Sequence, residues 1–537
     1  ISANSVTLMC ILKACSAIGI IEKGQEVHAE IETKGLLKSN PAIGNSLIDM
    51  YAKCGLLRDA QKMFDDLPVR DVVSWTALIT GYTEHNYGEA ALKYFEQMQV
   101  QGIPPNVVTF CCSLKACMGM TDFGKGKAIH IEIKRHPSLK GNLVVGSALI
   151  NMYATFGLIE KAQEVFDSLP EKNTALWNTL IIVYTECNHG KEALECLKQM
   201  QLEGMFVDTI TYVWCLKACV ILGDIKKAQE IHSEIEELGL EEDPSIGSTL
   251  IHMYANFGLL TKAQAAFDNL QCRDVVMWTA LIEAYTENEH GKEALECFEK
   301  MQHEGIFPNV VTFVCSLKAC GSICAIVTGE EIHVEIERKG LLERDLLVGN
   351  TLVDMYARCG LPAKAHQVCD KLPIRNAVSW TAVMAGYSQV GEIENVFCAL
   401  ERMVMEYIKP DPITFVVLLN ACSHIGNFEK SQTFFESMSK DYGIIPSCEH
   451  HNCVVDLLSR TGKLDKAVEM IQEIPVTCDL VVWHTLLSAC KKLGNIEVGK
   501  HVFDKALGLV DYNTPHTLFQ MGQFQEFSSV ESASSTY

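Results

Sequence analysis

The sequence predicts an all-α protein, an α-solenoid in which helix-turn-helix hairpins stack on one another. The prediction starts from residues 72–106, where two short amphipathic helices are separated by a break and followed by Gly and Pro residues. The apolar face of the first helix consists of Trp75, Leu78, Ile79 and Tyr82. We expect Ser74 to cap the start of this helix. Because neither helix can bury its apolar face alone, the hairpin must stack on neighbours of its own kind.

The recurrence of this hairpin is the second observation. It returns with small changes from residues 174, 275 and 377, and two related hairpins separate each copy from the next. Such self-similarity favours one elongated array over several independent domains. The array is expected to span residues 1–479. We call its three alternating types long (5–40, 107–142, 209–243, 310–345, 412–447), short (41–71, 143–173, 244–274, 346–376, 448–479) and middle (72–106, 174–208, 275–309, 377–411) repeats.

Tryptophan spacing is the third observation. Five of the six Trp residues recur almost evenly, and we expect them to pack in the core: Trp75, Trp177, Trp278, Trp380 and Trp483. The sixth, Trp214, falls outside the pattern.

Composition and charge restrict the function classes. Hydrophobic residues make up 48% of the chain, and polar residues interrupt every apolar run well before membrane length, so no membrane span is expected. The formal net charge of −22 argues against broad affinity for nucleic acid, because attraction to phosphates needs excess Lys and Arg; any basic face must be local. The 23 cysteines recur at equivalent helix positions, which favours free thiols over a disulfide framework.

Two positions in the short and middle repeats carry a restricted set of polar residues. The fifth residue is always Asn, Ser or Thr: Asn45, Thr76, Ser147, Asn178, Ser248, Thr279, Asn350, Thr381 and Asn452. The last residue is always Asn or Asp: Asp71, Asn106, Asn173, Asp208, Asp274, Asn309, Asn376, Asp411 and Asp479. We expect the fifth residue to lie off the apolar face, where it can face a groove.

These side chains suit the recognition of nucleic-acid bases. Hydroxyls and amides both donate and accept hydrogen bonds. A carboxylate accepts a hydrogen bond from a base that has an imino N–H, whereas an amide can donate one to a base that lacks it, so the choice between carboxylate and amide separates the two kinds of base. The alternative is that Asn, Asp, Ser and Thr at these positions only cap helices and fill turns.

The chain resembles plant pentatricopeptide repeat (PPR) proteins of the PLS subclass. The resemblance lies in the order of the repeat types and in the segments LIDMYAKCG, VVSWTALITGY and GIPPN. The resemblance extends from residue 5 to about residue 513. It implies a right-handed superhelix that binds single-stranded RNA in mitochondria or chloroplasts, one base per repeat and without a cofactor.

The resemblance also implies a target. In the family, Thr or Ser at the fifth position goes with purines, and Asn at that position goes with pyrimidines. Asn as the last residue favours A or C, and Asp as the last residue favours G or U. The implied string, 5′ to 3′, is U A N A U N G A N Y G N U, where N marks a long repeat and Y the pair Asn350 and Asn376. Long repeats carry Met9, Cys111, Val213, Val314 and Val416 at position five and should specify little.

Two further sets of residues complete the candidate site. The second residue of most repeats is small and apolar, and in the family such residues sandwich the bases: Val6, Val73, Val108, Val144, Val276, Val311 and Val378. Ser245 and Glu449 depart from this pattern. Lysines at position nine of the long repeats can meet phosphates or can simply be solvated: Lys13, Lys115, Lys217 and Lys318.

Two patterns that suggest metal or catalytic chemistry are interpreted as structural. An H-x-E, the start of a zinc-deaminase signature, begins at His28, His130, His232 and His333, but no P-C-x-x-C follows. The residues Cys448, His450, His451 and Cys453 are too closely spaced on one helix start to close a tetrahedral metal site. We expect no catalytic residues and no bound metal.

The C-terminal part departs from the repeat pattern. Residues 480–513 resemble the first half of the family's E extension, whereas the polar, Ser-rich residues 514–537 predict a disordered tail. We expect no DYW-type deaminase domain, so any role in C-to-U RNA editing would need a deaminase supplied in trans. The leading hypothesis is therefore a non-enzymatic, sequence-specific RNA-binding protein of plant organelles, for editing or other transcript processing; the alternative is a helical scaffold that binds proteins.

Overall fold

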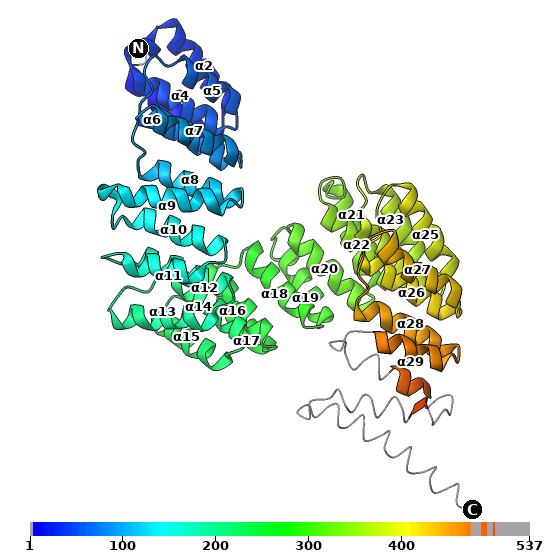
Figure 1. Ribbon diagram of the computed structural model, residues 1–537. Coiled ribbons are helices and arrows are strands. Elements are labelled where there is room, and N and C mark those ends of the chain that lie inside the picture. Colours follow the sequence, from blue (N-terminus) through cyan, green and yellow to red (C-terminus); the bar gives the residue numbers. More distant parts are fainter. Residues whose placement is uncertain (1–3, 474–484, 491–497, 500–537) are drawn as a thin grey trace, which may run out of the picture. The chain divides into compact units, whose positions relative to one another are not determined.

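The computed structural model describes residues 4–473, 485–490 and 498–499, and it confirms the all-α prediction. Residues 4–473 form 29 α-helices and one 3-10 helix, and the described part of the chain contains no strand (Figure 1). None of the described helices has the length and apolar character that a membrane crossing needs.

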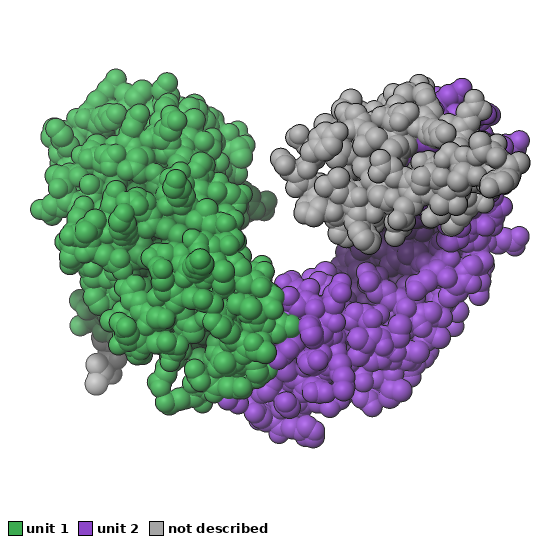
Figure 2. Space-filling model, turned by 90° about the horizontal axis from the view of Figure 1, so that it is seen from below, with its two compact units in different colours: residues 1–271 green, residues 272–537 purple. Residues whose placement is uncertain are grey.

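The chain divides into two compact units, residues 1–271 and residues 272–537, which Figure 2 colours separately. Each unit is a stack of helical hairpins. We call the first helix of each hairpin helix A and the second helix B. Helices A of unit 1 are α1 (Ser5–Ile18), α4 (Pro41–Lys53), α6 (Val72–Glu84), α8 (Val107–Gly119), α10 (Leu143–Thr155), α12 (Thr174–Glu186), α14 (Thr209–Leu222) and α16 (Pro244–Asn256).

Helices B of unit 1 alternate with these. They are α2 (Ile21–Thr33), α5 (Leu57–Asp66), α7 (Gly88–Val100), α9 (Phe123–Arg135), α11 (Ile159–Ser168), α13 (Gly190–Leu202), α15 (Ile225–Glu237) and α17 (Leu260–Asp268). The short helices α3 (Leu36–Ser39) and η1 (Pro137–Leu139) lie in connections.

Unit 2 repeats this arrangement. Its helices A are α18 (Val275–Glu287), α20 (Val310–Ile323), α22 (Leu346–Arg358), α24 (Ala377–Gln389), α26 (Pro412–Ile425) and α28 (Cys448–Arg460). Its helices B are α19 (Gly291–His303), α21 (Ile326–Arg338), α23 (Pro362–Lys371), α25 (Ile393–Met405), α27 (Phe428–Lys440) and α29 (Leu464–Glu473).

Helices A form the central row of each stack. In unit 1, α6 packs against α4 on one side and α8 on the other, and α12 packs likewise between α10 and α14. Helix B lies against its own helix A and against the next one, as α7 does with α6 and α8. Residues on helix A are therefore enclosed by two neighbouring repeats, which is why short helices suffice to bury a continuous core.

The recurring tryptophans lie in that core. Trp75, Trp177, Trp278 and Trp380 are at most 3% exposed, as expected, and Trp483 lies outside the described residues. Trp75 meets Phe64 of the preceding helix B edge to face, with ring centroids 4.7 Å apart, and Phe166 and Trp177 repeat this contact at 4.6 Å. Trp214 differs from these four because it is only half-buried.

Small residues let the repeats approach closely. At Gly146 of α10, an added Cβ would lie 2.6 Å from Cδ1 of Leu169 at the end of the same repeat. Gly44, Gly247 and Gly349 meet Leu67, Leu270 and Leu372 in the same way. Glycine at this helix position thus makes room for the leucine that closes the short hairpin.

Free thiols account for 21 cysteines in the described part of the chain. Cys448 is an exception to the expectation from sequence, because it forms a disulfide. Most of the predicted extension at 480–513, and all of the predicted tail at 514–537, lie outside the described residues.

Candidate functional site

The last residue of a repeat caps helix A of the next repeat. All eight of these residues within the described part of the chain are N-caps: Asp71, Asn106, Asn173, Asp208, Asp274, Asn309, Asn376 and Asp411. Each accepts a hydrogen bond on Oδ1 from the backbone N–H three residues further on, as in the 2.9 Å bond from Thr211 N to Asp208. The expectation that Ser74 caps α6 is therefore wrong, because Asp71 does so. Asp479 lies outside the described residues.

The fifth residue of helix A is buried, contrary to the expectation that it faces a groove. Asn45, Thr76, Asn178, Thr279, Asn350 and Thr381 are between 5% and 9% exposed. Ser147 and Ser248 are half-buried. Helical periodicity places this residue beside the apolar face of its own helix, but the neighbouring helix A covers it.

Burial brings the fifth and last residues of one repeat together in four cases. Nδ2 of Asn45 donates to both carboxylate oxygens of Asp71, at 3.1 and 3.3 Å. Nδ2 of Asn178 donates to Oδ1 and Oδ2 of Asp208, at 2.9 and 3.1 Å. The remaining pairs are Asn106 with Thr76 and Asn350 with Asn376, each joined by a 3.3 Å hydrogen bond.

A third residue completes this cluster, and the sequence analysis missed it. In five repeat pairs the third residue of the following helix A is a fully buried Ser or Thr, and its hydroxyl contacts the fifth residue of the preceding repeat. Thr211 Oγ1 donates to Asn178 Oδ1 at 2.6 Å and to Asp208 Oδ1 at 2.9 Å. The equivalent hydroxyl contacts join Thr76 to Thr109, Thr279 to Thr312, Asn350 to Ser379 and Thr381 to Thr414.

A sequence signal for this third residue was present. The third residue of all five long repeats is threonine: Thr7, Thr109, Thr211, Thr312 and Thr414. A buried hydroxyl needs a hydrogen-bond partner, so its recurrence inside an apolar helix pattern predicts a polar contact between repeats.

The other predicted pairs have different surroundings. The Ser147 hydroxyl accepts a 3.4 Å hydrogen bond from Thr179, and Ser248 Oγ donates to the Ser245 carbonyl at 3.1 Å. Ser248 belongs to unit 1, whereas its predicted partner Asp274 belongs to unit 2. Asn452 accepts a 3.0 Å hydrogen bond from the Thr485 hydroxyl.

Exposed aliphatic side chains flank the polar clusters. The second residue of helix A, one position before the buried third residue, is between 49% and 65% exposed in ten repeats: Val6, Val73, Val108, Val144, Ile210, Val276, Val311, Leu347, Val378 and Ile413. Ser245 and Glu449 occupy the same position and are also exposed. Branched apolar residues are thus exposed at one helix position in most repeats, beside the polar clusters.

The four lysines at position nine of the long repeats are exposed: Lys13, Lys115, Lys217 and Lys318. The Lys217 ammonium lies 4.2 Å from the centroid of the Trp214 ring. The fifth long repeat has Asn420 at this position, so the lysine series ends with the fourth long repeat.

Comparisons with known proteins agree with these features. The model of the PPR repeat family matches residues 70–119, 273–322 and 375–424. The model of the PPR repeat matches residues 45–72, 147–174, 175–205, 350–376, 413–442, 449–476 and 481–508. The chain belongs to the pentatricopeptide repeat family.

Three Arabidopsis thaliana relatives illustrate the similarity. A putative pentatricopeptide repeat-containing protein is 34% identical over 456 residues, covering 84% of this chain and 74% of the relative. A chloroplastic member is 31% identical over 516 residues, 93% of this chain and 58% of the relative. A mitochondrial member is 30% identical over 504 residues, 93% of this chain and 72% of the relative. This chain therefore spans part of each relative's length.

Solved structures confirm the fold. The crystal structure of the pentatricopeptide repeat protein PPR10, in complex with an 18-nt psaJ RNA element, superposes with a TM-score of 0.60. The match covers 98% of this chain and 84% of PPR10 at 16% sequence identity.

The histidines of the H-x-E sequences have a structural role in this pentatricopeptide repeat protein, as expected. Each donates to or accepts from the Tyr hydroxyl of the next helix A, as in the 2.6 Å contact between His130 Nδ1 and Tyr153. The other three contacts are His28 with Tyr51, His232 with Tyr254 and His333 with Tyr356. Burial lowers the pKa of His130 to about 4, and it also lowers the pKa of the other three histidines.

His232 also takes part in a cluster that the sequence analysis did not single out. Its Nε2 lies 3.6 Å from Oε1 of Glu236 and 3.6 Å from Oε1 of Glu241, and the three ligand atoms lie within 4.8 Å of one another. The contact between a histidine and the glutamate four residues later also occurs in the first long repeat, where His28 lies 3.5 Å from Glu32 without a second carboxylate of the described residues beside it. This His–Glu contact is therefore a feature of the long hairpin.

The closely spaced Cys and His residues of α28 also make structural contacts. The two ring nitrogens of the buried His450 lie 2.7 Å from the Ser447 hydroxyl and 2.8 Å from the Pro412 carbonyl. His451 Nδ1 lies 2.9 Å from the Ser447 carbonyl. The Cys453 thiol is directed at the Val416 carbonyl, and its burial raises the pKa to about 12.

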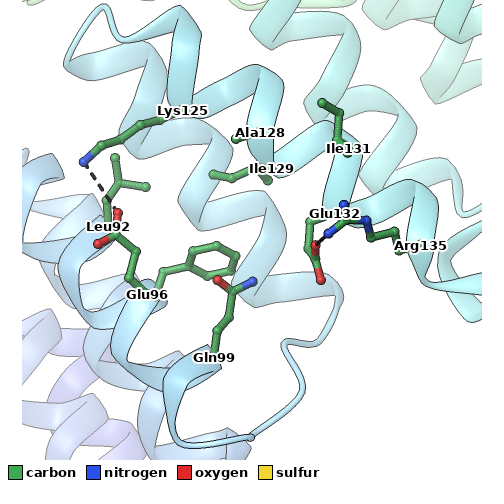
Figure 3. A pocket seen from close by; sticks show the side chains of 10 residues that line it. Leu92, Glu96, Gln99, Lys125, Ala128, Ile129, Ile131, Glu132 and Arg135 are labelled. Carbon is green, nitrogen blue, oxygen red and sulfur yellow. Dashed lines mark hydrogen bonds and ion pairs between the residues drawn. The ribbon is translucent and has the colours of Figure 1, made fainter.

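Helices B of two adjacent repeats form a pocket of about 340 Å³ (Figure 3). Phe95 and Glu96 of α7 and Ile129 and Glu132 of α9 are among its lining residues. Lys125 reaches toward Glu96 at 3.7 Å across the gap between the two helices. This pocket is lined by residues of helices B and contains none of the candidate base-reading residues.

Proposed function

We propose that the chain binds single-stranded RNA sequence-specifically, with one base per repeat, and has no catalytic activity of its own. The short and middle repeats select their bases, whereas the long repeats specify little. The observation that carries the proposal is the meeting of the fifth and last residues, as in the two hydrogen bonds from Asn178 to Asp208. Family membership supports the same function, since the PPR10 relative was crystallised with RNA.

The capping bond determines which atom of the last residue is left for a base. In Asp208, Oδ1 accepts the cap bond and the Thr211 hydroxyl, whereas Oδ2 accepts only from Asn178 among the described residues. A final Asp thus offers an acceptor, which suits the imino N–H of G or U.

A final Asn offers the opposite group. Oδ1 of Asn106 accepts from Thr109, so Nδ2 points away from the cap and donates to Thr76 with one of its two hydrogens. The second hydrogen is a donor for the ring nitrogen of A or C. The fifth residue adds the purine or pyrimidine preference, and the exposed aliphatic residues at position two provide apolar contact on the base faces.

The proposed target is the string U A N A U N G A N Y G N U. The hydrogen bonds between the fifth and last residues described above support this string most directly in three repeats. Repeats 41–71 and 174–208 are proposed to read U, and repeat 72–106 is proposed to read A. The exposed Lys13, Lys115, Lys217 and Lys318 are proposed to contact phosphates. Because the chain carries a net charge of −22, we expect modest affinity.

At a finer level, the alternation of three repeat types supports membership of the PLS subclass. We propose that the protein acts in mitochondria or chloroplasts as a specificity factor for C-to-U editing or other transcript processing. In editing, a DYW-type deaminase or another editing factor would be its partner in trans. The organellar proposal rests on relatives named chloroplastic or mitochondrial.

The proposal is tested by measuring fluorescence anisotropy with labelled single-stranded RNA at two salt concentrations. One RNA carries the proposed string, and the other has each specified base exchanged between purine and pyrimidine. We expect the proposed string to bind at least tenfold more tightly, and Thr279→Asn with Asn309→Asp to shift the preference of repeat 275–309 from A toward U. Equal affinity for both RNAs would contradict base reading and favour a scaffold that binds proteins.

A further inference from the structure

Trp214 is the one described tryptophan that is neither in the regular pattern nor fully buried. It occupies position six of helix A in the long repeat 209–243. The other long repeats have Cys10, Cys112, Cys315 and Val417 at this position. Cys112 illustrates how the smaller residue fits, because its thiol contacts the Thr80 hydroxyl of the preceding helix A at 3.3 Å.

A pocket of about 500 Å³ opens beside the Trp214 ring, a size typical of small-molecule sites. Three consecutive helices A line it, with Thr185 and Glu186 from α12, Trp214 and Lys217 from α14, and Ser248 and His252 from α16. All of these helices belong to unit 1. The pocket therefore lies on the helix row that carries the fifth and last residues, and Ser248 belongs to both sets.

The chemistry of the lining suits a nucleotide. The Trp214 indole lines the pocket with the Lys217 ammonium over its ring, 4.2 Å from the ring centroid, so an aromatic ring and a positive charge that can meet a phosphate stand side by side. Glu186 is the opposing charge in the lining, and the hydroxyls of Thr185 and Ser248 add polar groups. Base stacking on an aromatic residue is tolerant of sequence, because every base has a π-face.

We propose that this pocket is a stacking site for the base that faces repeat 209–243, the sixth nucleotide of the proposed string. This inference rests on the proposed function and deepens it. Position five of this repeat is Val213, so the repeat contributes affinity without selecting a base. The other long repeats lack the ring at position six and leave their nucleotides without this contact.

The test uses the complete chain with three RNAs that carry the proposed string: one intact, one abasic at its sixth nucleotide and one abasic at its third. The third nucleotide faces the long repeat 107–142, which has Cys112 in place of Trp214, and so serves as the matched control. We expect removal of the sixth base to weaken binding about tenfold and removal of the third base to change it less than about twofold. Because the protein is unaltered, folding does not affect the comparison.

A protein variant gives the complementary measurement. Trp214→Cys, which introduces the residue found in three other long repeats, should bind all three RNAs with similar affinity. Trp214→Phe should retain most of the difference in affinity between the intact RNA and the RNA that is abasic at its sixth nucleotide. Thermal unfolding followed by circular dichroism checks that both variants fold.

The outcomes separate the two proposals. If the unaltered protein recognises the intact string but loses the same affinity with either abasic RNA, the stacking site is wrong and base reading stands. If the string is bound no better than its purine–pyrimidine exchange, both proposals are wrong.

Discussion

Asn178 and Asp208, the fifth and last residues of repeat 174–208, share two hydrogen bonds, from Nδ2 to Oδ1 and Oδ2 at 2.9 and 3.1 Å. The same carboxylate caps α14 through Oδ1. One side chain thus stabilises the helix and presents Oδ2 beside Asn178. The two roles use different atoms, so substitutions can separate them.

Replacing the Asp208 carboxylate separates capping from base reading. Asp208→Asn keeps a cap oxygen but replaces the acceptor Oδ2 by a donor, so repeat 174–208 should lose its preference for U over C with little change in stability. Asp208→Ala removes both groups and should also lower the free energy of unfolding by about 1 kcal/mol. RNA binding with U or C at the fifth nucleotide, and thermal unfolding, measure the two effects. An unchanged U preference in Asp208→Asn would contradict the assigned role of Oδ2.

Thr211 should stabilise the cluster from inside. Thr211→Val removes the donor of the 2.6 Å bond to Asn178 and of the 2.9 Å bond to Asp208, leaving a buried amide oxygen with one partner fewer. We expect a loss of about 1–2 kcal/mol in unfolding free energy, together with faster hydrogen exchange in α12 and α14. Thr155→Val, at an exposed position, is the matched control and should have little effect. Equal stability of the two variants would argue against a stabilising role for the buried hydroxyl.

Gly146 tests the close packing of short hairpins. An alanine Cβ would lie 2.6 Å from Leu169 Cδ1, so Gly146→Ala should destabilise the protein by about 1–3 kcal/mol despite the better helix propensity of alanine. Gly119→Ala adds a Cβ that meets nothing within 4 Å and should be neutral or stabilising. Thermal unfolding measures both. Combining Gly146→Ala with Leu169→Ala should relieve the clash, which distinguishes steric conflict from a change in helix propensity.

Lys115 tests the phosphate contacts. Lys115→Ala should weaken RNA binding by a similar factor for all sequences, and the slope of log affinity against log salt should become shallower by about 0.7. Lys127→Ala removes an exposed lysine from helix B of the same repeat and should leave the slope unchanged. If the two variants have the same slope, Lys115 is a solvated surface residue.

The buried histidines should make stability depend on pH. Burial holds the pKa of His130 at about 4, below the value of about 6.5 expected in the unfolded chain. Between these values the unfolded state binds more protons, so stability should rise with pH across this window and be lost as pH falls from 6.5 to 4. Burial also lowers the pKa of His28, His232, His333, His366 and His450, which adds to the effect.

Thermal unfolding at pH values between 7.5 and 4.5 measures this dependence. His130→Gln should lose less stability over the acidic range than the unaltered protein. His303→Gln, at an exposed position, should follow the unaltered profile. A midpoint that does not change between pH 6.5 and pH 4.5 would contradict the prediction.

The hairpin, its repetition and the residues that form its core can be predicted from the amino-acid sequence alone. Spacing within one helix places Trp75 and Leu78 on a common face, and repetition of that face implies that hairpins stack. The same spacing led to a wrong prediction for Asn178. This residue lies beside the apolar face of its own helix, but the next helix A covers it. Local periodicity describes one helix, whereas burial depends on every helix that packs against it.

Which distant residues meet depends on how the helices pack in three dimensions. The packing of α12 against α14 brings Asn178 to Asp208 and Thr211, and residues of α12, α14 and α16 together line the pocket beside Trp214. The sequence showed that Asn and Asp recur at repeat ends but left capping and base reading as alternatives. The structure makes these alternatives compatible, because the cap engages Oδ1 and leaves the second atom of the side chain beside the fifth residue.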